Sequence, residues 1–384
     1  MKEERLQGYL QLILLLLNII IDESGEENQV LNENQELVEP ELLQVMAEEA
    51  EKLADHGKSN EANFFINLLL QLGEYLGSSQ QPQTIRQETA DTLLKVGIRW
   101  LQTSQFTLAL QVWEFTLTIY QEIKDRNGEA NSLGSLGIAY DSLGQYERAI
   151  KYYQQSLTIS QEIKDRNGEA ISLDNLGSAY RSLRQYEQAI EYHQQSLSIF
   201  QELKDRKGEA NSLNNLGSAY NGLGQYERAI EYHQQSLTIK RKIKDRNGEA
   251  ISLNNLGNAY DSLGQYERAI EYYQQSLTIA RELKNRTGEA NSLGSLGIAY
   301  HSLGQYERAI EYYKQSLTLF QELKNRNGEG NSLNNLGNAY LFLGQYEQAI
   351  EYYKQSLTLF QELKYRNGEA KSLGSLGIAY HSLG

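Results

Sequence analysis

Histidines and adjacent charged residues are the side chains of this chain that could do chemistry, but their spacing argues against a catalytic site. His193 and His233 lie forty residues apart without clustered ligands, so we expect packed histidines and no metal site. Glu147 and Arg148 recur at the same interval, which is typical of solvated charges on a helix. Cysteine is absent from the sequence, which excludes disulfides, thiolate zinc sites and cysteine nucleophiles. We therefore expect no enzyme, no metal and no cofactor.

One glycine motif has the residue pattern of a phosphate-binding loop but not the structural context that such a loop requires. Gly134-Ser135-Leu136-Gly137 recurs with small changes along the chain. A phosphate-binding loop needs a preceding strand and an open glycine turn, whereas this motif falls inside a helical pattern. We interpret it as structural.

Charge is unevenly distributed over the 384 residues, whose formal net charge is −14. Residues 1–87 hold 16 acidic and 5 basic residues, and residues 88–384 hold 34 acidic and 31 basic residues. Neither part has the excess of bases that binding to phosphates or to anionic lipids requires. We expect neither nucleic acid nor membrane as a partner.

An apolar run near the N-terminus needs a membrane check. A helix from Tyr9 to Ile21 would be about 20 Å long, which is short of a hydrocarbon core of about 30 Å. Acidic residues follow the run, where a signal peptide would have small residues for cleavage. We expect a buried helix in a cytoplasmic protein; an export or anchoring signal is the alternative.

A forty-residue repeat organises most of the chain. Gly128-Glu129-Ala130 returns every forty residues up to 368–370, with one alanine replaced by Gly330. The repeat divides the chain into a degenerate capping unit, six complete units and the first helix of an incomplete further unit. The capping unit covers 88–127 and the incomplete unit covers 368–384. The six complete units are 128–167, 168–207, 208–247, 248–287, 288–327 and 328–367. Both prolines precede the repeats, which can therefore be almost wholly helical.

Each unit is expected to form two helices. In the first complete unit, apolar residues recur at three- and four-residue intervals over about 129–143 (helix A) and 146–164 (helix B). Gly144 would end helix A in the left-handed conformation, and residues 165–168 would turn into the next helix. Gly137 lies inside helix A, and we expect it to allow a close crossing opposite Ala149. Arg184 stands where the other complete units have the terminating glycine.

These residues resemble the tetratricopeptide repeat. The likeness rests on a Leu-Gly pair, a tyrosine three residues after the glycine, an alanine nine further on and an aromatic four after that, and it covers residues 88–384. The forty-residue length, with Asn-Leu-Gly-Asn at 255–258 and 335–338, is similar to Leu-Gly-Asn-repeat adaptors and kinesin light chains. The resemblance implies an all-α fold: a right-handed superhelical solenoid of helix-turn-helix units.

Residues 1–87 have a different pattern. Apolar residues at 6–21, 37–53 and 62–76 predict three or four helices in an acidic N-terminal helical domain. This segment, with Tyr9-Leu10-Gln11-Leu12 and Ser24-Gly25-Glu26-Glu27, resembles the leader of bacterial repeat proteins that end in a caspase-like CHAT peptidase domain.

Asparagines supply the candidate binding site. In tetratricopeptide arrays helix A lines the concave face, and the resemblance places many asparagines there. The candidate peptide-binding residues are Asn131, Asn175, Asn211, Asn214, Asn215, Asn254, Asn255, Asn258, Asn291, Asn331, Asn334, Asn335 and Asn338. Each side-chain amide offers donors and an acceptor that match a peptide backbone. The alternative is that the amides bond between neighbouring helices. Only Arg181 and Lys371 are basic at these positions, which argues against a clamp for a C-terminal carboxylate.

Two functions follow from this interpretation. The first is a non-catalytic scaffold that binds a partner protein or peptide in the asparagine-lined groove. The alternative is the regulatory or sensor arm of a caspase-like peptidase, or of another signalling enzyme, whose catalytic domain lies elsewhere. The sequence stops after helix A of the incomplete unit, so we expect Leu376, Ile378 and Tyr380 to be poorly covered. That helix could also support self-association.

Overall fold

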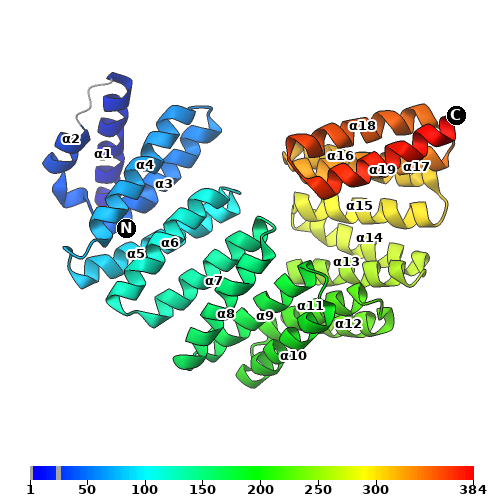
Figure 1. Cartoon of the computed structure of the whole chain (residues 1–384), viewed down its shortest axis with the longest axis horizontal. Coiled ribbons are helices and arrows are strands. Elements are labelled where there is room, and N and C mark those ends of the chain that lie inside the picture. The colour runs from blue at the N-terminus through cyan, green and yellow to red at the C-terminus, as the bar shows by residue number, and fades with distance from the viewer. Residues whose placement is uncertain (1–2, 23–26) are drawn as a thin grey trace. The chain divides into compact units, whose positions relative to one another are not determined.

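The computed structural model describes residues 3–22 and 27–384, and every regular element within those ranges is a helix (Figure 1). The chain forms two compact units, residues 1–183 and 184–384. None of the helices in the described ranges is both long enough and apolar enough to span a bilayer. The expectation of an all-α repeat fold is confirmed.

Ten helical elements build the N-terminal unit as far as its residues are described. They are α1 (Glu3–Asp22), α2 (Glu27–Glu33), η1 (Gln35–Leu37), α3 (Pro40–Asp55), α4 (Ser59–Gly77), α5 (Gln83–Gln102), α6 (Phe106–Ile123), α7 (Arg126–Ser142), α8 (Tyr146–Glu162) and α9 (Arg166–Ser182). Proline marks two helix starts: Pro40 occupies the first turn of α3, and Pro82 directly precedes α5. Proline is favoured there because its missing N–H would have no partner within the helix.

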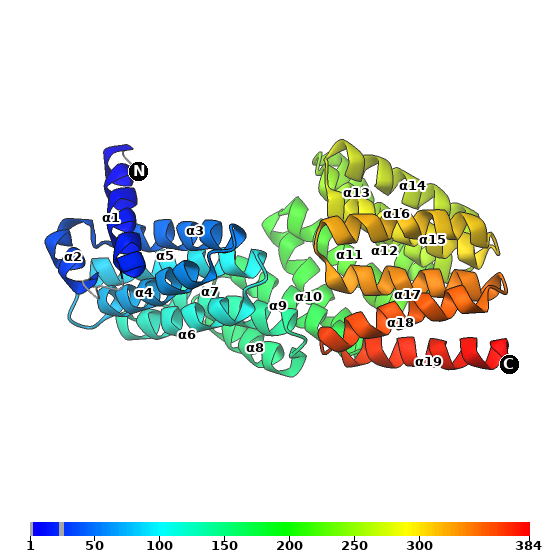
Figure 2. The same cartoon turned by 90° about the horizontal axis from the view of Figure 1, so that it is seen from above.

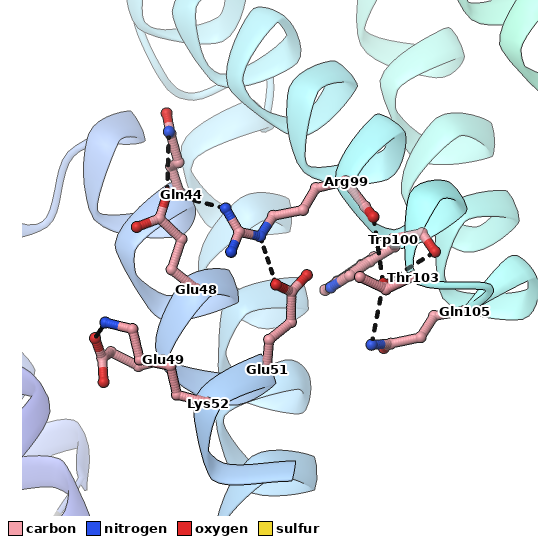
Figure 3. A network of polar contacts seen from close by, with 9 residues as sticks. All are labelled: Gln44, Glu48, Glu49, Glu51, Lys52, Arg99, Trp100, Thr103 and Gln105. Carbon is pink, nitrogen blue, oxygen red and sulfur yellow. Dashed lines mark hydrogen bonds and ion pairs between the residues drawn. The ribbon is translucent and has the colours of Figure 1, made fainter. Parts of the chain in front are cut away.

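One core joins the N-terminal helices to the first repeat-like hairpin. Trp100 of α5 and Trp113 of α6 are fully buried in the same cluster as apolar residues of α1, α3 and α4. In Figure 3, Arg99 of α5 reaches across to α3, where its Nε donates to Glu51 at 2.6 Å and its Nη1 donates to Glu48 at 3.3 Å. The boundary expected between residues 87 and 88 therefore falls inside α5, and both sides of it contribute to one core.

Helical pairs continue through the C-terminal unit (Figure 2). The helices are α10 (Tyr186–Leu203), α11 (Arg206–Gly222), α12 (Tyr226–Lys242), α13 (Arg246–Ser262), α14 (Tyr266–Glu282), α15 (Arg286–Ser302), α16 (Tyr306–Glu322), α17 (Arg326–Phe342), α18 (Tyr346–Glu362) and α19 (Arg366–Leu383). Each odd-numbered helix from α11 to α17 packs against the next odd-numbered helix as well as against the even-numbered helix between them. Helix A of one repeat therefore lies beside helix A of the next.

The helix ends differ from the prediction in one respect. Helix A of the first complete unit starts at Arg126 rather than near 129, because the Asp125 carboxylate caps it by accepting from the backbone N–H groups of Asn127 and Gly128, each at 3.0 Å. The expected turn at 165–168 is correspondingly shorter, since Asp165 is itself the cap and the helix starts at the next residue. Gly144 has the predicted left-handed conformation, with φ of 71°.

The glycine inside helix A faces an aromatic ring of helix B. A Cβ atom on Gly137 would collide with the ring of Tyr153, a buried aromatic residue of helix B. In the third and fourth complete repeats, a Cβ on Gly217 would lie 2.7 Å from His233 Nδ1, and one on Gly257 would lie 2.6 Å from Cδ1 of Tyr273. Glycine is therefore required because a bulky side chain of helix B rests directly on the helix A backbone.

Helix α19 has a partly covered apolar surface. Ile378 and Tyr380 are 59% and 48% exposed, as expected. Leu376, by contrast, is only 8% exposed, because it packs in a cluster with Ile350 and Tyr353 of α18. The expectation of a poorly covered Leu376 is wrong for this reason.

Candidate functional site

Three consecutive pockets lie between neighbouring A helices of the C-terminal unit. The first, between α11 and α13, has a volume of about 210 Å³; the second, between α13 and α15, about 230 Å³; the third, between α15 and α17, about 460 Å³. Asn247 and Ile251 line both the first and the second pocket, and Asn254 and Asn291 line both the second and the third. The three pockets therefore adjoin one another along the A helices, and together we call them the asparagine groove.

Asparagine is the commonest residue in this groove. The asparagines that line it are Asn211, Asn214, Asn247, Asn254, Asn255, Asn285, Asn291, Asn325, Asn327, Asn331 and Asn335. The second and third pockets have no charged residue in their lining. Such a surface offers hydrogen-bond donors and acceptors without a net charge, which suits the N–H and C=O groups of a peptide backbone.

Seven of the thirteen predicted asparagines meet in the groove, and six do not line it. The seven are Asn211, Asn214, Asn254, Asn255, Asn291, Asn331 and Asn335. Of the others, Asn131 and Asn175 belong to the N-terminal unit, and Asn334 is fully buried. Asn215, Asn258 and Asn338 lie on the same helices but outside the lining of these pockets.

Some asparagines use their amides inside the protein. Tyr273 donates its hydroxyl hydrogen to Asn258 Oδ1 at 2.8 Å, and Tyr353 does the same to Asn338 Oδ1 at 2.7 Å. Asn334 Nδ2 lies 3.4 Å from Ser372 Oγ. These three side chains connect helices, as in the alternative interpretation of the asparagines.

Asn214 combines a pocket position with internal bonds. Its Oδ1 accepts from His233 Nδ1 at 3.0 Å and from Asn255 Nδ2 at 3.2 Å. His233 is buried, and its burial lowers the pKa of the imidazole to about 4. The imidazole is therefore neutral at pH 7, and Asn214 holds its Nδ1 hydrogen in place.

Asn254 differs from Asn258 and Asn338, whose amide oxygens accept hydrogen bonds. Its Oδ1 is shielded from solvent, yet within the described part of the chain it accepts no hydrogen bond, as is also true of Asn334 Oδ1. Asn254 lies where the second and third pockets meet. A shielded carbonyl oxygen without a donor is costly, so this atom marks a place where an N–H group from a ligand would be stabilising.

The first pocket also carries charge. Lys240 of α12 is only 4% exposed, and its Nζ donates to Asn211 Oδ1 at 2.6 Å and to Asp245 Oδ2 at 2.9 Å. Burial acts to raise the pKa of the Asp245 carboxyl, but the hydrogen bonds from the Gly248 N–H and from Lys240, together with the positive charges of Lys240 and Lys207, lower it overall. Asp245 is therefore a carboxylate at neutral pH.

Sequence reasoning missed part of the lining. Asn285 and Asn325 cap α15 and α17, each accepting from a backbone N–H at 2.9 Å. Asn247 and Asn327 lie in the first turns of α13 and α17. They occupy the turns between repeats, to which the sequence pattern assigns only chain reversal. The change from aspartate at Asp245 to asparagine at Asn285 and Asn325 in the cap position is the signal that could have found the last two. Lys240 was missed because it lies at the end of helix B, where its side chain packs near the first turn of the next repeat.

The expected solvated charges are found at the surface. Glu147 and Arg148 are exposed; Arg148 lies over the ring of Tyr140 at 4.9 Å and donates to Gln145 Oε1 at 3.0 Å. This arrangement leaves no acid–base geometry at that pair.

A further cavity of about 450 Å³ lies in the N-terminal unit beside α4 and η1, and its lining is mainly apolar. Its one carboxylate, Glu39, already accepts from Arg5 Nε at 2.8 Å and from the hydroxyl of Tyr9. The cavity therefore offers a ligand less polar chemistry than the asparagine groove does.

Helical hairpins of forty residues, stacked so that successive A helices form one polar groove, define a repeat solenoid of the protein-binding kind. The family model of the tetratricopeptide repeat matches residues 88–162, 168–242, 208–282, 248–322 and 328–384. These matches cover well over half of the chain, which therefore belongs to the tetratricopeptide repeat family.

Solved structures share this fold. The apo form of RapI has a TM-score of 0.59 at 18% identity, covering 72% of this chain and 98% of that one. A Rap protein complexed with competence and sporulation factor has a TM-score of 0.53 at 17% identity, covering 90% and 99%. A STAND protein with a tetratricopeptide repeat sensor from Pyrococcus horikoshii has a TM-score of 0.54 at 18% identity, covering 93% and 62%. At such identities the likeness concerns the fold alone. No curated protein matches the chain.

Proposed function

We propose that the chain is a non-catalytic scaffold that binds an extended segment of a partner protein in the asparagine groove. The shielded Asn254 Oδ1, which has no donor among the described residues, is the observation that carries this proposal. Its position between two uncharged, asparagine-lined pockets supports recognition of a peptide backbone largely independent of side-chain sequence. The Rap protein solved with competence and sporulation factor supports binding by this type of fold.

The groove also sets the length of the segment. Packed helices lie about 10 Å apart, and an extended chain rises about 3.3 Å per residue, so each pocket corresponds to roughly three residues. Three pockets therefore accommodate about nine to twelve residues. A random library of peptides of about this length is a suitable probe.

The test replaces Asn254 and Asn291, the two asparagines shared by the second and third pockets, with alanine. Each lost amide bond should cost about 0.5–1.5 kcal/mol, so peptides selected on the parent should bind the double variant roughly 5- to 150-fold more weakly. Thermal stability should be unchanged or slightly higher, because alanine is the better helix former. Affinity is measured by fluorescence anisotropy, and stability by circular dichroism.

Asn131→Ala is the matched control, because Asn131 occupies the repeat position of Asn291 but lies outside the three pockets. It should leave peptide affinity unchanged. If Asn254→Ala/Asn291→Ala binds the selected peptides as tightly as the parent does, the groove is not the binding surface. If that variant unfolds at a clearly lower temperature, the two amides are structural.

A second function is the sensor arm of a signalling enzyme, such as a caspase-like peptidase. The STAND protein, whose repeats are described as a sensor, supports it, since this chain covers only 62% of that larger protein. Sequencing the complete gene tests this function: a reading frame without an effector domain would contradict it.

A further inference from the structure

One hairpin of this acidic protein ends in a cluster of bases. The last turn of helix B is Ser160-Gln161-Glu162 in the first complete repeat, but Lys240-Arg241-Lys242 in α12. Together with the neighbouring turns, these residues form what we call the basic patch. Its members are Lys204, Arg206, Lys207, Lys240, Arg241, Lys242, Lys244 and Arg246. The whole chain has 50 acidic and 36 basic residues, so such a cluster departs from its average.

About half of the patch is already neutralised. Arg241 and Arg246 both bind Glu249, at 2.8 and 2.6 Å, and Arg206 binds Glu209. Lys240 is paired with Asp245. The remaining members, Lys204, Lys207, Lys242 and Lys244, are exposed and form no ion pair with any described residue. The patch therefore presents uncompensated positive charge.

Lys242 in addition occupies a position at which other repeats have a glutamate that forms an ion pair. In the first complete repeat, Arg126 binds Glu162, and Arg246 binds Glu282 at 2.5 Å in the repeat that follows the patch. In the repeat that contains α12, Arg206 occupies the position of Arg126 and Arg246. Lys242 occupies the position of Glu162 and Glu282. Two like charges thus occupy the positions that form an ion pair in those repeats, which favours an anion there.

Two members of the patch reach the asparagine groove. Lys240 and Lys207 line the first pocket, next to Asn211 and Asn214. The buried ion pair of Lys240 with Asp245 forms part of the lining, together with the exposed Lys207 of α11. A chain that runs along the groove therefore meets bases in the first pocket and uncharged amides in the next two.

We propose that the bound peptide is acidic at one end: its Asp or Glu side chains lie against the basic patch, and the adjoining residues extend into the two uncharged pockets. This inference rests on the proposed function and adds the partner's charge and its direction along the groove. A nucleic acid fits less well, because its evenly spaced phosphates would continue into pockets that contain no base. Several bases, rather than one, favour acidic side chains over a single terminal carboxylate.

The test uses a variant designed from the chain itself. Lys240→Ser, Arg241→Gln and Lys242→Glu restore the residues that α8 has at 160–162, and Lys207→Asn restores the residue found at 127 and 167. These side chains already exist at matched positions of folded repeats, and a thermal melt of the full-length quadruple variant confirms its folding. Parent and variant are each used to select from the same random library of about twelve-residue peptides with amidated C-termini.

Peptides selected on the parent should be enriched in Asp and Glu at one end, and the variant should select peptides without that enrichment. An acidic peptide from the parent selection should bind the variant at least about 10-fold more weakly, and the difference should shrink as salt is raised. Equal affinity for parent and variant, or the absence of acid enrichment, would overturn the inference while leaving the proposed function standing. Failure of both proteins to select any peptide would overturn the proposed function and this inference together.

Two further arms exclude the other anions. The inference requires that amidation does not abolish binding of the acidic peptide. If only the free-acid form binds, the patch holds a terminal carboxylate and the inference is wrong. A single-stranded oligonucleotide that displaces the acidic peptide at physiological salt, and that fails to bind the variant, would also overturn it.

Discussion

Side-chain amides of the same residue type have two roles in this molecule, and Asn214 combines both. Asn258 and Asn338 accept from tyrosine hydroxyls of the paired helix and so stabilise individual hairpins. Asn254 has its oxygen shielded in the groove, without a donor in the described part of the chain. Substituting the first kind should lower stability, and substituting Asn254 should lower affinity. An alanine scan that measures both quantities distinguishes the roles.

His233 makes the C-terminal unit sensitive to acid. Its pKa is about 4 in the folded protein, and a histidine in the unfolded chain has its ordinary value of 6.5. Between these values the unfolded chain binds a proton that the folded chain does not, so stability is complete above about pH 6.5 and declines as the pH falls toward 4. The loss attributable to His233 should approach about 3 kcal/mol at pH 4.

His233→Tyr should remove this contribution, because tyrosine occupies the same position in α14, where it packs on Gly257 as His233 packs on Gly217. Urea unfolding of both proteins at pH 7 and at pH 4.5 checks the prediction. The parent should lose more stability than the variant on acidification. Equal losses would show that His233 becomes protonated without unfolding the repeat.

Helix ends are the elements most sensitive to single residues here. Helix A ends at a left-handed glycine in most repeats, such as Gly264 with φ of 78°, but Arg184 adopts φ of 60° at the same place. The left-handed conformation destabilises the folded state by about 1–2 kcal/mol when the residue is not glycine. Glycine avoids this strain, but its greater freedom in the unfolded chain offsets part of the gain in stability. Arg184→Gly should therefore stabilise the protein by about 1 kcal/mol in a denaturant titration.

The reverse substitution, Gly264→Arg, is the matched control and should destabilise by a similar amount. Open space surrounds Gly264, so the strain of the backbone dominates over any clash. A lower midpoint for Arg184→Gly would mean that the arginine side chain makes a stabilising contact.

Periodicity predicted the hairpins and their order, because the spacing of Leu133, Leu136 and Tyr140 already identifies a buried side. The assignment of the asparagines to the concave face of helix A came from the resemblance to the tetratricopeptide repeat. It did not predict that helix B ends at left-handed lysines such as Lys164, with φ of 60°, since lysine has no intrinsic preference for that conformation. It also missed Lys240 in the groove, because contacts between repeats depend on how one hairpin packs on the next. Which asparagines line the groove and which form internal hydrogen bonds, or do both as Asn214 does, became known only from their neighbours in the structure.

For the molecule as a whole, the repeat architecture implies that a destabilising substitution affects mainly its own repeat and the adjoining ones. In a solenoid each repeat contacts only its neighbours, so its stability is a sum of local terms. A Cβ on Gly257 would overlap the Tyr273 ring, so Gly257→Ala should cost about 1–3 kcal/mol. Hydrogen exchange should accelerate in residues 248–287 and in the adjoining helices, and remain unchanged in α5 and α6.

Gly377→Ala is the matched control, since a Cβ atom added at this equivalent position of α19 would have no neighbour within 4 Å. Alanine also favours the helix by about 1 kcal/mol over glycine. The substitution should slow exchange in α19 or leave it unchanged. If Gly257→Ala accelerated exchange uniformly along the chain, the repeats would be unfolding as one cooperative body.

The two tryptophans of the sequence, Trp100 and Trp113, are both buried in the α5–α6 hairpin, so the C-terminal unit contains none. Excitation at wavelengths that tyrosine does not absorb will therefore report on the N-terminal core and on nothing in the groove. The C-terminal repeats contribute through tyrosines, such as Tyr220 and Tyr232, which are stacked with ring centroids 5.2 Å apart. Comparing the two excitation wavelengths thus shows, without any label, whether the repeats unfold together with the N-terminal core or separately from it.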